Sequence, residues 1–255
     1  MADQRRLPQL TDRLVSLDAL VGDDPVWRAI ADIAARMRVD EWVLIGGQMV
    51  ALHGFIAGTS PPRATTDIDI VADVLVRAGA LGRCVDVLTS MHLEGKPSIT
   101  DRSLHRFVGE RATVDLVVPD HLPKTASTRI RGYQAVPVVG GQRALDRATR
   151  VAVNVGGALV EVVVPDLRGA IVLKARAAVV DWRDNDRHLT DIAFLCGLVL
   201  DPLGLSAELD AKERASLRRV DLPDDPRMPP WVRFETAIRL DAVETWRTLR
   251  AVSRG

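Results

Sequence analysis

The chain has 255 residues, of which 47% are hydrophobic and 27% are charged. This length and composition are typical of a globular protein with one substantial core or two modest ones. Lys and Arg together number 34, as do Asp and Glu together. The balance excludes an overall positive charge that would draw the protein to nucleic acid or to an anionic membrane. Any contact with nucleic acid must therefore come from a local basic patch.

The cysteines and the apolar runs indicate the cellular compartment. Cys84 and Cys196 are far apart and have no metal-type spacing, which fits a reducing cytosol and argues against a disulfide scaffold. The first residues, MADQRRLPQLTDRL, contain no apolar core of signal-peptide length. No later run approaches the roughly 18–20 apolar residues that span a bilayer. We therefore expect a soluble, cytoplasmic protein without a membrane partner.

The N-terminal half mixes patterns typical of helices and of strands. Asp24 before Pro25 predicts the start of a helix in DDPVWRAIADIAARMRV. After it the patterns predict, in chain order, a buried strand at 42–45, a turn at Gly46 and Gly47, a short helix at 48–57, a strand at 67–72, a helix at 79–91 and an antiparallel hairpin at 105–119 turning at 109–111.

The C-terminal half has a different pattern. Val-rich runs and Gly pairs in 132–165 predict further sheet or a bridging hairpin. From Pro165 onward, apolar residues at three-to-four spacing predict helices at 165–180, 186–200, 212–220 and 231–250. We therefore expect an α/β (α+β) fold, with a mixed sheet in a domain of residues 1–164 and a helical domain of residues 165–255.

Two carboxylates stand one residue apart in the stretch RATTDIDIVAD at 63–73. Because alternate side chains of a strand share a face, Asp67 and Asp69 would project together, away from the core. Like charges this close repel unless a cation shares them, and a divalent metal ion with oxygen ligands supplies one. Asp115 becomes a third ligand if its strand lies beside the first. We expect Mg²⁺, as one ion or two; the alternative is an exposed strand face.

The pair Gly46–Gly47 predicts a second half of the site. Peptide N–H groups are free where a helix begins, and glycine allows a phosphate group to come close. The alternative is a turn that only serves packing of the helix. A phosphate site at this turn would coincide with the metal site predicted at Asp67 and Asp69.

The chain contains IGG and, about 20 residues later, TDIDI. This pattern resembles the signature of the nucleotidyltransferase fold, in which an apolar residue and two glycines are followed by Asp, an apolar residue, Asp and an apolar residue. The chain further resembles the AbiEii and MenT group, nucleotidyltransferase toxins of type IV toxin–antitoxin pairs. In that group Arg, any residue and Ser precede the metal strand; here Arg63, Ala64 and Thr65 do. Its helical half has a Lys and a downstream Asp, similar to Lys174 and Asp191.

The resemblance covers roughly residues 40–200 and departs from the group at two positions, Thr65 in place of Ser and His188 before Asp191. It implies transfer of a nucleoside monophosphate from a nucleoside triphosphate (NTP), the substrate, to an acceptor hydroxyl. The implied residues are Asp67, Asp69 and Asp115 for metal; Gly46, Gly47, Arg63, Thr65 and Lys174 for nucleotide; and Asp67, Asp69, Asp115, Lys174 and Asp191 for catalysis.

Each of these residues has a plainer alternative. Thr65 would cap a turn, Lys174 would extend its amine to water, and Asp191 would pair with an arginine. The toxin resemblance implies an RNA acceptor, a tRNA end, and an antitoxin protein as partner, with Arg214, Arg218 and Arg219 as a candidate RNA-binding face. The remaining alternatives are a small-molecule nucleotidyltransferase of the aminoglycoside type and an inactive member that binds only a nucleotide or a partner.

Overall fold

The computed structural model describes residues 7–76, 79–181 and 185–251. The chain forms two compact units: unit 1 comprises Met1–Met49 and Ala64–Asp166, and unit 2 comprises Val50–Arg63 and Leu167–Gly255. Unit 2 thus includes residues 50–63, which the sequence analysis placed with the N-terminal half. The predicted domain boundary after residue 164 stays a prediction. Residues 1–6 and 252–255, at the outer ends of the two predicted domains, lie outside the described part.

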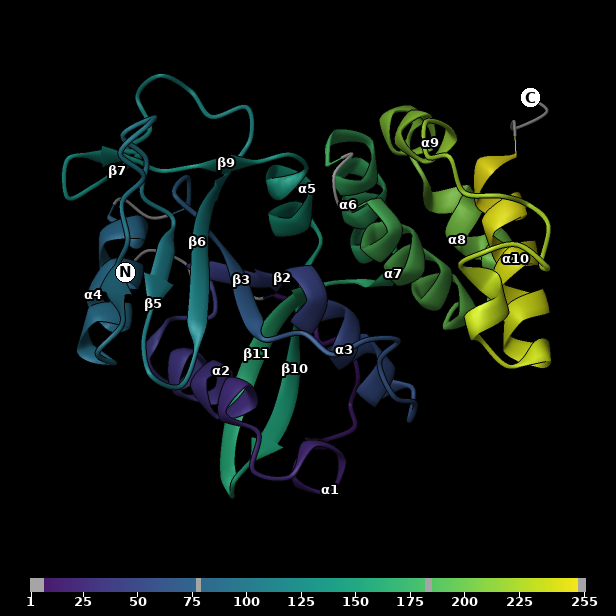
Figure 1. Ribbon diagram of the computed structural model, residues 1–255, viewed down its shortest axis with the longest axis horizontal. Coiled ribbons are helices and arrows are strands. Elements are labelled where there is room, and N and C mark those ends of the chain that lie inside the picture. Colours follow the sequence, from purple (N-terminus) through teal and green to yellow (C-terminus); the bar gives the residue numbers. More distant parts are fainter. Residues whose placement is uncertain (1–6, 77–78, 182–184, 252–255) are drawn as a thin grey trace. The chain divides into compact units, whose positions relative to one another are not determined.

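Unit 1 is a mixed α/β structure (Figure 1). Its strands are β1 (Val15–Ser16), β2 (Trp42–Ile45), β3 (Asp67–Ala72), β4 (Glu94–Gly95), β5 (Arg106–Val108), β6 (Thr113–Pro119), β7 (Arg129–Ile130), β8 (Tyr133–Gln134), β9 (Pro137–Val138), β10 (Ala148–Val155) and β11 (Ala158–Pro165). Its helices are α1 (Asp18–Val21), α2 (Pro25–Arg36), α4 (Ala80–Ser90) and α5 (Gly141–Asp146), while α3 (Gly46–Ile56) begins in unit 1.

The main sheet of unit 1 has the strand order β2-β3-β6-β5-β4, with β9 added along β6. β3 pairs parallel with β6, whereas β2 pairs antiparallel with β3 and β5 antiparallel with β6. Ile68 and Ile70 of β3 are fully buried, while Asp67 and Asp69 are half-buried. The alternation therefore places the carboxylates away from the core, as predicted for a strand with one packed face.

Most predicted elements of unit 1 are confirmed, including both strands 42–45 and 67–72, the capped helix α2, helix α4 and the β5–β6 hairpin. The Asp24 side chain accepts a hydrogen bond from the Val26 amide, which is the predicted cap. The region 132–165 contains the long hairpin β10–β11, and also α5, a helix that the sequence analysis did not predict. Helix α3 begins at Gly46, two residues before the predicted start.

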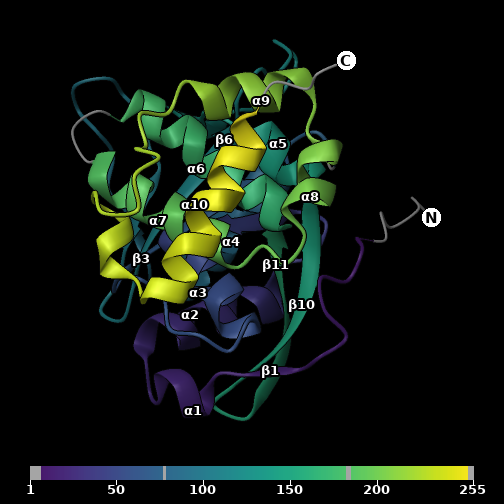
Figure 2. The same cartoon turned by 90° about the vertical axis from the view of Figure 1, so that its right-hand side faces the viewer.

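Unit 2 is helical, as the spacing of apolar residues from Pro165 onward predicted (Figure 2). It contains α6 (Leu167–Val180), α7 (Asn185–Gly197), α8 (Pro202–Glu208), α9 (Ala211–Arg218), the 3₁₀ turn η1 (Trp231–Arg233) and α10 (Thr236–Arg250). Helix α7 packs against α6 and α10. Trp231 and Trp246 are fully buried, and their indole N–H groups donate to the carbonyls of Pro223 and Leu222.

Both cysteines are free and buried. Burial raises the pKa of the Cys84 thiol to about 12, and burial also raises the pKa of the Cys196 thiol. Because the thiolate is the reactive form, both cysteines serve packing, as expected.

Among the described residues, no single helix is long and apolar enough to cross a membrane; only the bent pair Asn185–Gly197 and Pro202–Glu208 passes, by length and composition alone.

Candidate functional site

The three carboxylates predicted from the sequence gather on neighbouring strands of unit 1 (Figure 1). β3 and β6 run parallel, with Asp69 in register with Asp115 and Asp67 in register with Thr113. Because residues in register on paired strands share a face, the three carboxylates project from the same side of the sheet. The prediction that the hairpin strand lies beside the Asp67 strand is thus confirmed. We call Asp67, Asp69 and Asp115 the acidic cluster.

Arg106 on β5 supplies a positive charge to the acidic cluster, and the sequence analysis did not single it out. Its Nε donates to Asp115 Oδ1 at 2.9 Å and its Nη2 to Asp115 Oδ2 at 2.8 Å. Nη2 also lies 4.0 Å from Asp67 Oδ2. These bonds and charges, first of Asp115 and then of Asp67 and Asp69, raise the pKa of the Arg106 guanidinium. Arg106 therefore stays charged and balances part of the cluster.

The Gly46–Gly47 pair begins helix α3 directly against the acidic cluster. Gly46 has φ of +69°, a conformation that strains residues with a side chain. A Cβ atom at Gly46 would overlap the carboxylate of Asp69. A Cβ atom at Gly47 would lie 2.8 Å from Thr65 Oγ1, too close for non-bonded atoms. Both glycines are thus required by the approach of two predicted site residues, and the first amides of α3 open next to them.

The loop before β3 is fastened to the start of α3. The buried side chain of Gln48 donates from Nε2 to the carbonyl oxygen of Thr65 at 2.9 Å. This bond fixes the backbone that carries the Thr65 hydroxyl beside the glycine turn. Gln48 is thus a positioning residue that sequence spacing alone did not indicate.

The structure brings Lys174, Asp191 and Arg63 together within unit 2. Arg63 Nε and Nη2 donate to the two oxygens of Asp191 at 3.0 and 2.9 Å, and Lys174 Nζ lies 2.8 Å from Asp191 Oδ2. The side chains of Lys174 and Asp191 are 5% and 1% exposed. Lys174 thus does not extend to water, whereas Asp191 does pair with an arginine. We call these three residues the buried ion cluster.

Burial raises the pKa of Asp191, but the charges and hydrogen bonds of Lys174 and Arg63 outweigh it and hold the pKa below its usual value. Asp191 is therefore ionised at neutral pH. His188 lies nearby on α7, where burial and the charges of Lys174 and Arg187 lower its pKa despite its contact with Asp181. His188 is accordingly neutral at pH 7.

The three arginines of the candidate RNA-binding face differ in their surroundings. Arg214 is half-buried and donates from Nη2 to the Ser206 carbonyl at 2.5 Å and from Nη1 to Ser206 Oγ at 3.2 Å. Arg218 is exposed and makes a long bond of 3.4 Å to the Arg250 carbonyl, and Arg219 is also exposed. Arg214 thus serves packing within unit 2, and the accessible part of the face is Arg218 and Arg219.

The acidic cluster has the donor chemistry of a magnesium site, since carboxylate oxygens are the ligands that this ion prefers. Asp67 and Asp69 fit as the pair that would hold an ion. Within residues 7–76, 79–181 and 185–251, however, no three acidic, His or Cys side chains already stand in a metal-binding arrangement. Both oxygens of Asp115 accept hydrogen bonds from Arg106. Metal ligation by Asp115, which stays a prediction, would bring the ion next to the positive charge of Arg106.

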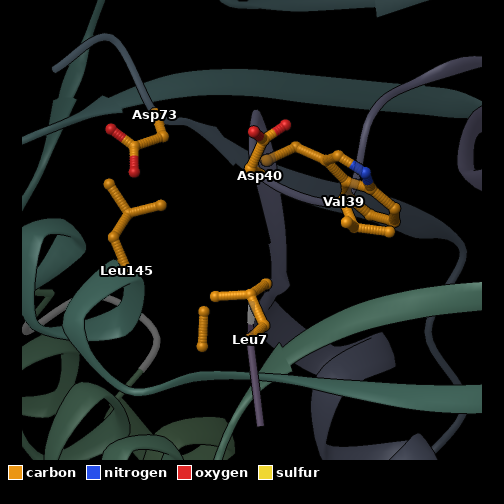
Figure 3. Close-up of a pocket in the computed structure, with 7 residues that line it drawn as sticks. Leu7, Val39, Asp40, Asp73 and Leu145 are labelled. Atoms are coloured by element: carbon orange, nitrogen blue, oxygen red, sulfur yellow. The ribbon is translucent and has the colours of Figure 1, made fainter. Parts of the chain in front are cut away.

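A small pocket of unit 1 lies among Leu7, Val39, Asp40, Trp42, Asp73, Leu145 and Ala148. Figure 3 shows the carboxylates of Asp40 and Asp73 in the upper part of the view, with Leu145 below Asp73 and Leu7 lowest. Its volume of about 10 Å³ suits one water molecule, far below the ~300–1,000 Å³ of a ligand site. Asp73 accepts hydrogen bonds from the amides of Leu75 and Val76, so it shapes a turn.

No family model and no curated protein matches the sequence. Among solved structures, the chain is similar to one described as an antigenic nucleotidyltransferase-like protein from Paracoccidioides brasiliensis. The similarity has a TM-score of 0.48 and 16% sequence identity, and it covers 76% of this chain and 86% of that chain. It assigns neither a family nor an activity to this chain.

Proposed function

We propose that the protein is a metal-dependent nucleotidyltransferase, which moves a nucleoside monophosphate from an NTP to an acceptor hydroxyl and releases pyrophosphate. One observation carries the proposal: the start of α3 at Gly46–Gly47 stands against both the Asp69 carboxylate and the Thr65 hydroxyl. Amides at a helix start bind phosphate, and carboxylates bind the metal ion that accompanies it. The two kinds of ligand for a metal–phosphate group therefore coincide.

The plainer alternatives each explain only part of this arrangement. A packing turn would account for the glycines but not for a second carboxylate, Asp67, on the same face of β3. An exposed strand face would account for Asp67 and Asp69 but not for a turn that excludes a Cβ atom in favour of the Asp69 carboxylate. A nucleotide site accounts for both the paired carboxylates and the glycine turn, and we therefore prefer it to the two alternatives.

In the proposed reaction, Asp67 and Asp69 hold Mg²⁺, which when bound neutralises phosphate charge and acts as a Lewis acid. The first amides of α3 and the Thr65 hydroxyl orient phosphate oxygens. The resemblance implies that Asp115 assists the acceptor hydroxyl. For unit 2, the resemblance implies that Lys174 and Arg63 would neutralise triphosphate charge. Transfers at phosphorus depend mainly on positioning and charge neutralisation, and these residues are of the types that provide both.

For the acceptor we propose RNA, a tRNA end, and with it the role of a toxin that an antitoxin protein controls. The support is the resemblance to the AbiEii and MenT group at Arg63, Thr65, Lys174 and Asp191. Three of these residues, distant in sequence, are in direct contact in unit 2. This contact does not bear on the identity of the acceptor, so the choice of RNA rests on the resemblance.

The test is transfer of label from each of the four α-³²P NTPs, with Mg²⁺, to total RNA or to an aminoglycoside. We expect label in RNA with one or more NTPs, and none after addition of a chelator. Asp69→Ala should abolish the transfer, whereas Asp86→Ala, which removes an exposed carboxylate from α4, should not. Label only in the aminoglycoside would favour the small-molecule enzyme. No label in any acceptor would contradict the proposal.

A further inference from the structure

We propose that Arg106 is the resident counter-ion of the acidic cluster, and that a divalent metal ion binds by displacing its guanidinium from Asp115. The inference rests on the proposed function, because it concerns the same carboxylates. It makes Arg106 a positioning residue that sets the metal affinity of the site. Neither the metal-binding motif nor the glycine turn includes this residue.

The hairpin geometry places Arg106 at this position. β5 and β6 pair antiparallel, with Arg106 directly opposite Asp115. The two side chains form a pair of parallel bonds at 2.9 and 2.8 Å, which occupies both oxygens of the carboxylate. This bidentate geometry is particular to arginine, since the ammonium of lysine is a point donor. Arg106 thus binds Asp115 through two directed hydrogen bonds and not only through its positive charge.

The same guanidinium balances a second member of the cluster. Its Nη2 lies 4.0 Å from Asp67 Oδ2, within the range of an ion pair. Three carboxylates on one face of a sheet repel one another unless a cation lies among them. Within the described part of the chain, the guanidinium of Arg106 forms ion pairs with two of them. It therefore occupies the electrostatic role that a metal ion would have.

A metal ion can replace the guanidinium of Arg106 because that side chain is partly exposed to water. The side chain of Arg106 is 47% exposed, so the guanidinium can move into water without leaving a buried charge unpaired. The side chain of Asp115 is 15% exposed and stays on the sheet. Each oxygen of Asp115 has a second lone pair that could face a metal ion, but an ion bound there would lie beside the guanidinium, and the two positive charges repel one another. The apparent metal affinity is therefore reduced by the fraction of molecules in which Arg106 holds Asp115.

The experiment is a titration of the full chain with Mn²⁺ alone, followed by calorimetry or by the signal of free Mn²⁺ in electron paramagnetic resonance. Arg106→Gln should bind Mn²⁺ about tenfold more tightly than wild type. Arg111→Gln is the matched control, because it removes the same charge from an exposed position in the turn of the same hairpin. Arg111→Gln should change the affinity little.

Two further variants separate displacement from a general effect of charge. In an Asp115→Asn background, Arg106→Gln should raise the affinity much less than in wild type, because only the 4.0 Å contact with Asp67 remains to be lost. Arg106→Lys keeps the charge but loses the bidentate bonds, so its affinity should lie between those of wild type and Arg106→Gln. It also serves as the test if Arg106→Gln fails to fold. Equal affinities of wild type, Arg106→Gln and Arg106→Lys would overturn the inference, as would an equal gain in Arg111→Gln.

Failure of the inference and failure of the proposed function have different signatures. Mn²⁺ binding that Asp67→Asn abolishes but Arg106→Gln leaves unchanged overturns the inference alone. The expected gain in Arg106→Gln, without nucleotide transfer by wild type, supports the inference and contradicts the proposed function. Absence of Mn²⁺ binding in wild type and in every variant overturns both.

Discussion

Charged side chains gather at two places in this protein, and the two arrangements are opposite. In the acidic cluster of unit 1, three carboxylates lie on one face of the sheet and the guanidinium of Arg106 contacts two of them. The side chains of Asp67 and Arg106 are 50% and 47% exposed. In the buried ion cluster of unit 2, one carboxylate lies between two cations, and Asp191 is 1% exposed. The side chains of Asp67 and Arg106 in the first cluster thus reach water, while Lys174 and Asp191 in the second are buried.

The difference predicts which cluster contributes to the stability of the fold and which does not. Removing a carboxylate from a group of like charges relieves repulsion, so a substitution in the acidic cluster should cost the fold little. Removing one partner from a buried ion pair leaves an uncompensated charge, so the buried ion cluster is part of the core of unit 2. Variants of the two clusters should therefore separate activity from stability.

The largest effect is expected for Asp69→Ala in the acidic cluster. Loss of a metal-holding carboxylate should remove several kcal/mol of charge stabilisation, which lowers the transfer rate by about 10³-fold or more. The melting temperature should stay the same or rise slightly, because the variant relieves repulsion. Transfer of labelled nucleotide is measured beside a thermal melt. If the Asp69→Ala protein stays active, Asp69 does not hold a metal ion, and the proposed difference in role between the two clusters is wrong.

In the buried ion cluster, Asp191→Ala should lower the free energy of unfolding by about 3–5 kcal/mol, because Lys174 and Arg63 lose their shared carboxylate. Lys174→Met should cost much less, since it leaves the bidentate Arg63–Asp191 pair intact. Urea unfolding of the three proteins measures both values. If Asp191→Ala unfolds at the same urea concentration as wild type, this cluster is not part of the stable core.

The pH dependence of stability should sharpen the comparison at His188, whose pKa is lowered in the folded protein by burial and by Lys174 and Arg187. The unfolded state then binds the proton more tightly, so His188 contributes stability above its unfolded pKa. That contribution is lost as the pH falls from its unfolded pKa through its lower folded pKa. The melting temperature should therefore fall on acidification from pH 7 to pH 5, and less so in His188→Gln. Identical pH profiles would exclude His188 as the source.

The smallest effect is expected outside both clusters, on the exposed arginines of α9 and its end. Arg218→Ala combined with Arg219→Ala should weaken RNA binding modestly while NTP binding is unchanged. Each lost phosphate contact should reduce the slope of log affinity against log salt by roughly 0.7–0.9. Arg214→Ala should instead affect stability, since its guanidinium binds Ser206. Weaker RNA binding with an unchanged slope would argue against direct contact.

The secondary structure was predictable where local sequence determines it. β2 and β3 have the predicted bounds because short apolar runs bordered by glycine or charge leave few alternatives. Helix α5 was missed because six residues are too few to show a helical period. The early start of α3 was missed because Gly46 and Gly47 have low helix propensity and were interpreted as a turn before the helix.

The site residues were predictable where the alternation of side chains along a strand determines their position. They were less predictable where contacts between distant parts of the chain determine it. Asp67 and Asp69 followed from the period of two, and Asp115 followed once its strand was placed beside theirs. Arg106 was accessible to the same reasoning, because a turn at 109–111 sets the register that puts it opposite Asp115. The Arg63–Asp191 pair joins residues 128 positions apart, and no spacing rule indicates such a contact.

The central claim is that the acidic cluster and the glycine turn transfer a nucleoside monophosphate rather than a phosphate group, and the position of a label tests it most directly. Wild-type protein is incubated with RNA and Mg²⁺, and with an NTP labelled either at the α- or at the γ-phosphate. Nucleotide transfer predicts α-label in RNA and γ-label in released pyrophosphate, with both lost in Asp69→Ala. Label from the γ-phosphate in RNA, with none from the α-phosphate, would contradict the account.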